Sequence, residues 1–276
     1  MNRLLAANFM RLKKSKVFWL CMLYMAVFAG MAVMSNHRVL KEGGNPMLED
    51  MVFTAAPFIG ILAACFVSLF VGTEYSDGTI RNKVIIGHSR TAVYLSNLLT
   101  SAAAGILMYA VYLAVYIGLG IPEAGWFDGE PKRLVLLLVC TLVLSAAFAS
   151  IFTLVVMLNQ NKAAVAVISV LLAFGILFAG TFILSRLSEP EYYDGYIYIT
   201  DDGTREQAPR EKNPRYLEGA KREVYEFFYD FLPGGQQMQL AEGSAENPGR
   251  LMGYSAVIIV VTTAAGIFLF RRKDLK

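Results

Sequence analysis

Long uncharged runs dominate the pattern of hydrophobic and polar positions along the chain. Six stretches contain no Asp, Glu, Lys or Arg, and each is 18 to 25 residues long. A helix needs about 20 apolar residues to cross the hydrocarbon core of a bilayer, and it satisfies its own backbone hydrogen bonds there. The pattern therefore predicts an all-α membrane protein with six transmembrane helices, over residues 17–34, 53–73, 98–119, 134–158, 163–185 and 251–270.

Composition and charge support this fold class and orient it. Hydrophobic residues make up 56% of the chain and charged residues 17%, proportions that favour a membrane protein. With the amino terminus inside, the cytoplasmic segments hold 13 Lys or Arg and three acids, whereas the outer loops hold 12 and 19. Cytoplasmic loops carry the excess of positive charge, so both termini are predicted in the cytoplasm. The net charge of +3 gives no reason to invoke a nucleic acid partner.

The first residues, 2–16, place Leu5, Phe9 and Leu12 at helical spacing among basic residues. This pattern is typical of an amphipathic helix at the inner membrane surface, in contact with lipid. An alternative is that the basic residues only set the topology. A secretory signal peptide is a third interpretation, and the 18-residue apolar run that follows argues against it.

The chain divides into three parts. Residues 1–185 hold the amino-terminal helix and five spans, 186–250 form a small α+β extracellular insertion, and 251–276 hold the last span and a basic cytoplasmic tail. Within the insertion, the alternation at 192–200 predicts a hairpin, and 217–232 predicts a helix that stops at Pro233-Gly234-Gly235. That helix carries an apolar, largely aromatic face that needs a cover; its members are Val224, Phe227, Phe228 and Phe231.

The chain lacks the residues that catalysis needs. It has no Gly-x-x-x-x-Gly-Lys-Ser/Thr loop for ATP, and its two histidines, His37 and His88, are predicted on opposite sides of the membrane. Intramembrane proteases and proton-coupled transporters use ionisable residues within their spans, and the six spans have no Asp, Glu, Lys or Arg. The sequence predicts a non-catalytic membrane subunit with no catalytic residue, metal site or cofactor of its own.

The stretch at 72–90 lies between two spans and has the composition of neither a span nor a solvated loop. Asp77 or Thr79 can cap a short helix there and Gly87 can end it, with apolar and basic residues between. A helix of two turns is stable only when it is packed against something. Two alternatives stay open from the residues alone: the helix packs on the chain's own inner helices, or it docks into another cytoplasmic protein.

The same stretch carries a family resemblance. Its motif Glu74-x-x-x-Gly78-Thr79-Ile80-Arg81, followed by Gly87-x-Ser89-Arg90 and Tyr94, resembles the loop between the second and third spans of ABC-2 type permeases, the membrane subunits of bacterial ABC exporters. The basic amino terminus, the six spans and the turn Phe231-Leu232-Pro233-Gly234-Gly235-Gln236 before the last span also resemble that family. Asn97 departs from it, since many relatives carry Lys there.

The resemblance implies an exporter in the bacterial plasma membrane. It implies two permease chains, identical or different, and two separately encoded ATP-binding subunits that hold ATP and magnesium. A coupling helix in the loop would sit in a groove of the ATPase, with Ile80 and Val84 as its buried contacts; the residues implied in coupling are Glu74, Gly78, Thr79, Ile80, Arg81, Val84, Ser89 and Arg90. The outer insertion resembles those of permeases for peptide-antibiotic resistance and immunity, which implies a hydrophobic or amphipathic substrate such as an antimicrobial peptide.

Two other functions stay open. A membrane sensor or scaffold would bind a ligand at 186–250 and recruit a signalling protein at 72–90, without ATP-dependent flux. An autonomous channel would conduct without a partner, but nothing in the spans resembles a selectivity filter or a ring of charges.

Overall fold

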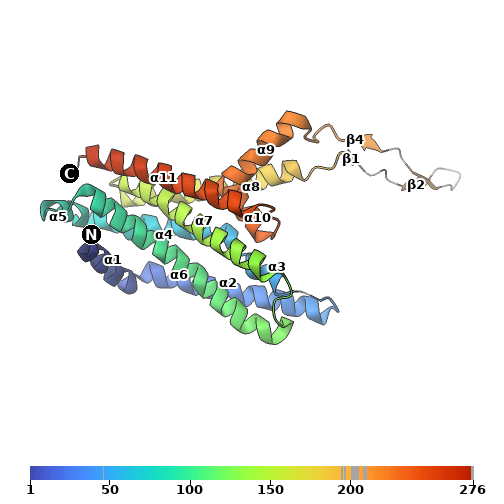
Figure 1. Cartoon of the computed structure of the whole chain (residues 1–276), viewed down its shortest axis with the longest axis horizontal. Coiled ribbons are helices and arrows are strands. Elements are labelled where there is room, and N and C mark those ends of the chain that lie inside the picture. Colours follow the sequence, from blue (N-terminus) through green and yellow to red (C-terminus); the bar gives the residue numbers. More distant parts are fainter. Residues whose placement is uncertain (46, 194, 196, 200–204, 208–209, 275–276) are drawn as a thin grey trace.

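The computed structural model of the protein describes residues 1–45, 47–193, 195, 197–199, 205–207 and 210–274, and it shows a bundle of long helices (Figure 1). Within these described residues, six helices are long and apolar enough to cross a membrane. They confirm the six predicted spans, and most extend past the uncharged run into polar flanks. Their bounds are α2 Lys16–Lys41, α4 Ala56–Ser76, α6 Arg90–Ala124, α7 Pro131–Met157, α8 Lys162–Leu187 and α11 Pro248–Arg272.

Both chain ends lie at the same end of the bundle, together with the short helix α5, Thr79–Ile85 (Figure 1). The strands and α9, Gly219–Phe231, project from the opposite end. An even number of spans returns the chain to the side from which it started. The assignment of that side to the cytoplasm remains a prediction from the charge distribution, and we refer to it below as the inner end.

The first helix, α1, runs from Asn2 to Lys14 and contacts α6. Its buried residues are Leu4, Asn8 and Leu12, whereas Phe9 is 37% exposed. The face of Leu4, Asn8 and Leu12 therefore meets the protein, and of the residues predicted to contact lipid, Leu12 is buried while Leu5 and Phe9 stay accessible. Contact of this helix with lipid remains a prediction. Ser15 then accepts a hydrogen bond from the Phe18 backbone N–H, 3.3 Å long, and caps α2.

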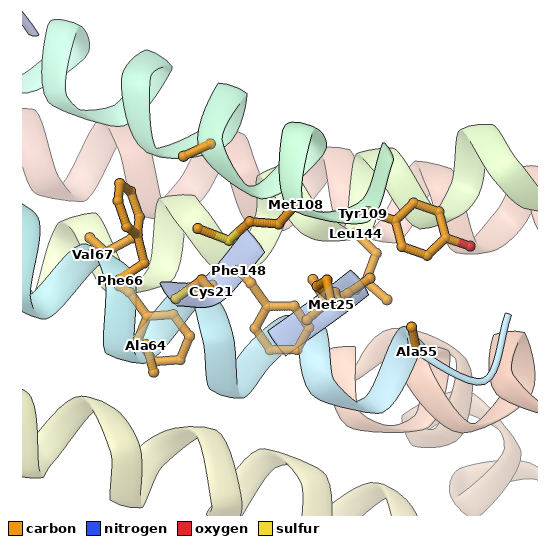
Figure 2. Packing of buried hydrophobic residues seen from close by; sticks show 14 of the residues in the cluster. Cys21, Met25, Ala55, Ala64, Phe66, Val67, Met108, Tyr109, Leu144 and Phe148 are labelled. Atoms are coloured by element: carbon orange, nitrogen blue, oxygen red, sulfur yellow. The ribbon is translucent and has the colours of Figure 1, made fainter. Parts of the chain in front are cut away.

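The core runs along the bundle between α2, α4, α6 and α7. Figure 2 shows side chains from these four helices meeting there: Cys21, Met25, Ala64, Phe66, Val67, Met108, Tyr109, Leu144 and Phe148. Small residues let the helices approach, since a Cβ on Gly105 would lie 2.5 Å from the Ser145 hydroxyl of the facing helix. The bundle thus has a packed interior.

Tyrosines of α6 hold the loop between α2 and α4 against the outer half of the bundle. The Tyr112 hydroxyl donates to the carbonyl oxygen of Met51 at 2.6 Å, and the Tyr116 hydroxyl donates to that of Leu48 at 2.8 Å. This loop includes the one-turn helix α3, Glu49–Val52. Buried phenols find hydrogen-bond acceptors in this way, and the backbone carbonyls of an irregular loop gain donors.

The predicted hairpin is present. Strand β1, Tyr192–Tyr193, pairs antiparallel with β4, Glu211–Lys212, and β2, Ile197–Ile199, pairs antiparallel with β3, Arg205–Gln207. The predicted turn at 201–203 lies outside the described residues. The helix predicted over 217–232 is α9.

Pro233-Gly234-Gly235 was predicted to stop α9, and it also begins another helix, α10, Pro233–Ala241. Proline suits the first turn of a helix, where its missing N–H has no partner to lose. A Cβ on Gly234 would lie 1.9 Å from the Ile176 carbonyl oxygen, and one on Gly180 would lie 2.2 Å from the Gly234 backbone. The glycines therefore let α10 lie directly on α8.

Helix α10 is buried among the spans. It contacts α4, α7 and α8, and Gln236 and Gln237 are nearly inaccessible to solvent. The Ser255 hydroxyl of α11 donates to Gln236 Oε1 at 2.6 Å, and Gln237 Nε2 donates to the Pro57 carbonyl at 3.3 Å. The segment 186–250 is thus of two kinds: strands and α9 that project, and a helix that re-enters the bundle.

Candidate functional site

The segment that joins α4 to α6 forms a compact turn around α5. After α4, the chain turns at Gly78 with φ 67°, and after α5 it turns at Gly87 with φ 100°. Both lie in the left-handed region, which favours glycine. The predicted end of the helix at Gly87 is confirmed. At the start, Gly78 is the capping residue, and neither Asp77 nor Thr79 makes a side-chain capping bond.

The apolar residues of α5 face in two directions. Ile80 is 1% exposed and Val84 is partly buried, and both contact the core of the bundle. By contrast, Ile85 is 69% and Ile86 is 78% exposed. Ile80 therefore holds α5 on its own chain, and the apolar surface open to another protein is the pair Ile85 and Ile86, beside the exposed Arg81. The burial of Ile80 agrees with the first alternative left by the sequence, packing on the chain's own helices. Docking into another protein stays a prediction.

A buried carboxylate lies directly behind α5. Glu74, in the last turn of α4, is 1% exposed. Its Oε1 atom pairs with the guanidinium of Arg11 from α1 and with the ammonium of Lys83 from α5. Its Oε2 atom accepts a hydrogen bond from Asn97 Nδ2 of α6 at 2.9 Å. One side chain thus joins four elements of the inner end.

Asn8 of α1 completes this group. Asn8 Nδ2 donates to Asn97 Oδ1 at 2.8 Å, and Lys83 Nζ donates to Asn8 Oδ1 at 3.0 Å. We name Asn8, Arg11, Glu74, Lys83 and Asn97 the inner polar cluster. Asn97 was only a departure from the family motif in sequence reasoning, and Asn8 was not singled out. The signal that points to Asn8 is its position between Leu4 and Leu12, at steps of four on one helix face.

The charges of the inner polar cluster do not balance. Burial lowers the pKa of Arg11 and of Lys83, and the carboxylate of Glu74 partly offsets this for both. The surplus positive charge lies over an aromatic face, since Arg11 Cζ is 3.8 Å from the ring centroid of Phe70. Removing the carboxylate would leave Lys83 without a counter-charge and Arg11 with only the weaker attraction of Asp77.

Ser89 and Arg90 lie at the start of α6. The Ser89 hydroxyl accepts a hydrogen bond from the Ala92 backbone N–H at 3.2 Å and caps α6. Arg90 Nη1 donates to the carbonyl oxygens of Phe270 and Arg271, each at 3.1 Å. Of the residues implied in coupling, these two anchor helix ends, Glu74 and Ile80 lie inside the chain, and Arg81 is on the surface.

The outer end carries the predicted apolar face of α9. Val224, Phe227 and Phe228 are each 44–51% exposed, whereas Phe231 is partly buried. The rings of Phe227 and Phe231 contact Tyr254 of α11, with centroids 5.9 and 5.6 Å apart. The bundle therefore covers one edge of this face and leaves the rest open.

A cavity of about 400 Å³ also opens near this end, between the α2–α4 loop, the start of α7 and the end of α10. Its apolar walls include Phe53, Leu134 and Leu137, and carboxylates of Asp128 and Glu130 line it. Among the residues that the structure describes, no group of three His, Cys, Asp or Glu could hold a metal ion.

The sequence profile of one family, described as ABC-2 family transporter protein, matches residues 4–180, which is more than half of the chain. The chain belongs to this family. The match begins in α1, includes the whole inner polar cluster and the α5 segment, and ends in α8. No curated protein matches the chain.

Membership of the ABC-2 family, together with the six apolar helices, makes the chain a multi-pass membrane protein and a permease component of an ABC transporter. Such permeases are generally non-catalytic and partner with an ABC ATP-binding subunit. The hairpin, α9, α10 and α11 lie beyond the matched residues.

Proposed function

We propose that this ABC-2 permease is the membrane-spanning subunit of a bacterial exporter, and that α5 docks into a groove of its ATP-binding subunit. The observation that carries the proposal is the two-sided character of α5: Ile80 and Lys83 hold it to the bundle, while Ile85 and Ile86 are open at the inner end. Burying an exposed isoleucine contributes about 1.5–3 kcal/mol, so covering this pair supplies a substantial part of a docking energy.

The inner polar cluster suits this role mechanically. Glu74 ties α5 to α4, and through Asn97 it ties both to α6. A short helix held in this way moves together with the ends of two spans instead of sliding over them. In the proposed transporter, closure of an ATPase dimer therefore displaces α4 and α6 through α5. A pair of permease chains, identical or different, with two ATP-binding subunits is the assembly that this mechanism needs.

For the substrate, we propose a hydrophobic or amphipathic molecule such as an antimicrobial peptide, moved outward. The supporting features are at the outer end: a cavity with apolar walls and carboxylates, and the half-exposed apolar face of α9. Surfaces that are both apolar and charged fit amphipathic ligands. The projecting hairpin and α9 also suit the alternative of a sensor or scaffold that binds a ligand without transport.

The docking surface is tested with the double substitution Ile85→Asp and Ile86→Asp. We expect binding of the co-expressed ATP-binding subunit to fall by at least about tenfold, which corresponds to about 1.4 kcal/mol, and ATP-dependent transport in vesicles to fall with it. The matched control is Asn82→Asp, which adds a carboxylate at an exposed position of the same helix without removing an apolar side chain. Unchanged ATPase binding by the double variant would refute docking through this surface.

A flux measurement distinguishes the proposed exporter from the alternative of a sensor or scaffold. Proteoliposomes that contain the permease and the ATP-binding subunit are expected to move a labelled amphipathic peptide only when ATP is present. Specific binding of that peptide to the outer segment with no ATP-dependent movement would favour the sensor or scaffold.

A further inference from the structure

The last described residues, 271–274, were expected to be a plain basic tail, but they are bound into the inner end of the bundle. The guanidinium of Arg90, the first residue of α6, donates to the carbonyl oxygens of Phe270, Arg271 and Lys273. The last carbonyls of a helix have no donor within the helix, and a positive charge is favourable at its carboxyl end. Arg90 therefore caps α11 from a different span.

Lys273 makes the second attachment. Its Nζ atom donates to the Met157 carbonyl oxygen at 3.2 Å and lies 3.4 Å from the Tyr75 hydroxyl. That hydroxyl donates to the same Met157 carbonyl at 2.5 Å, and Lys273 Nζ is 4.6 Å from the centroid of the Tyr75 ring. The side chain of Lys273 thus joins the inner ends of α4 and α7, and Tyr75 is the neighbour of Glu74 in the chain.

Two further contacts extend this attachment. Gln160, in the connection between α7 and α8, donates through Nε2 to the Asp274 carbonyl oxygen at 3.0 Å. In the last turns of α11, Gly266 makes room for the ring of Tyr94, because a Cβ there would lie 2.1 Å from the Tyr94 hydroxyl. The inner end of α11 and the residues after it are therefore in contact with α4, α6, α7 and the α7–α8 connection.

These contacts matter because α11 is the least buried of the six spans. It lies mainly on α7, so little else ties it to the α5 segment. We propose that residues 271–274 act as a latch, in which Arg90 and Lys273 are positioning residues that make α11 follow the movement of the α5–α6 junction. This inference rests on the proposed function, since it assumes that an ATP-binding subunit moves α5.

The test uses Arg90→Met and Lys273→Met in the complex of permease and ATP-binding subunit, reconstituted in liposomes. Both replacements keep much of the apolar stem and remove the donors. For Lys273→Met, which lies outside the residues implied in coupling, we expect ATPase binding and the rate of ATP hydrolysis to stay within about twofold of the wild type, because α5 is intact. The number of substrate molecules moved per ATP is expected to fall at least fivefold. Arg90→Lys, which keeps a charged donor, is expected to restore much of that ratio.

The matched control is Arg271→Gln. Its side chain is exposed and its backbone carbonyl, which Arg90 contacts, is retained, so its transport per ATP should equal that of the wild type. A merely structural role would lower hydrolysis and transport together, whereas the latch predicts a change in their ratio. A normal ratio in both Met variants would overturn the proposal.

A second measurement does not depend on any ATPase. In the purified permease, Lys273→Met is expected to speed hydrogen–deuterium exchange in the last turn of α11 and at the end of α4, but not in α10, with Arg271→Gln again as the control. Exchange equal to that of the wild type would also overturn the latch. Failure of the proposed function would show differently, as a wild-type permease that binds no ATP-binding subunit.

Discussion

Replacing Glu74 with glutamine removes the carboxylate that Arg11 and Lys83 share behind α5. The side chain of Lys83 is 13% exposed and that of Arg11 is 32% exposed, so neither cation gains full hydration in exchange. Removing one partner of a buried ion pair costs about 3–5 kcal/mol, because the other charge stays buried without compensation. We expect Glu74→Gln to lower the free energy of unfolding by this amount.

Removing the arginine of the same cluster should lower the free energy of unfolding much less than removing the acid. Arg11→Met removes the surplus positive charge and leaves Lys83 and Glu74 as a neutral pair. After this change Glu74 keeps Lys83 as its counter-charge, so no buried charge is left uncompensated, and methionine keeps an apolar contact with Phe70. We expect the free energy of unfolding to fall by no more than about 1 kcal/mol, the contribution of a partly exposed pair. The charge balance therefore predicts a large effect for the acid and a small one for the arginine, although the two side chains contact each other.

The assay is thermal unfolding in detergent, followed with a thiol-reactive dye that reports on the free cysteines Cys21, Cys65 and Cys140. At roughly 2 °C per kcal/mol for a chain of this size, the midpoint should fall by about 6–10 °C in Glu74→Gln. In Arg11→Met it should fall by about 2 °C or less. Adding Lys83→Met to Glu74→Gln should recover part of the loss, since one uncompensated cation is gone. Equal losses in the two single variants would refute the charge-balance reasoning.

Two further predictions concern α10 and the tail. Gly234→Ala should lower the same unfolding midpoint, because its Cβ would lie 1.9 Å from the Ile176 carbonyl oxygen and overpacking costs about 1–3 kcal/mol. The control Gly175→Ala should leave the midpoint unchanged, because a Cβ there meets nothing within 4 Å. Equal midpoints in the two variants would contradict the close contact. Lys273 should titrate at about pH 8, because partial burial lowers its pKa from 10.5 to about 8. Since the folded pKa lies below the unfolded one, this group makes the fold more stable as pH rises from about 8 to 10.5. NMR of the chain with ¹³C-methylated lysines measures the titration, Lys273→Arg assigns the signal, and a midpoint near 10.5 would contradict the burial.

Several parts of the site could be predicted from the sequence because their residues are neighbours along the chain. The positions of α5, of its left-handed end at Gly87 and of the buried Glu74 all lie in one short stretch with a recognisable motif. Asn8 and Asn97 could not be read in this way. They are polar residues at the borders of apolar segments, and only the contact of α1 with α6 brings Asn8 to Asn97, which in turn donates to the carboxylate of Glu74.

The sequence alone determined the number of spans, the hairpin and the place of the short helix α5. It could do so because the thickness of the bilayer translates directly into the length of an uncharged run, and because strand alternation is a local signal. The tertiary structure alone decided which isoleucines of α5 are covered, since that helix is apolar on two sides and only its packing on the bundle selects Ile80 over Ile85 and Ile86. It also decided that α10 re-enters the bundle and that the tail is bound, because both depend on close contacts between residues far apart in the chain, such as Gly234 with Gly180.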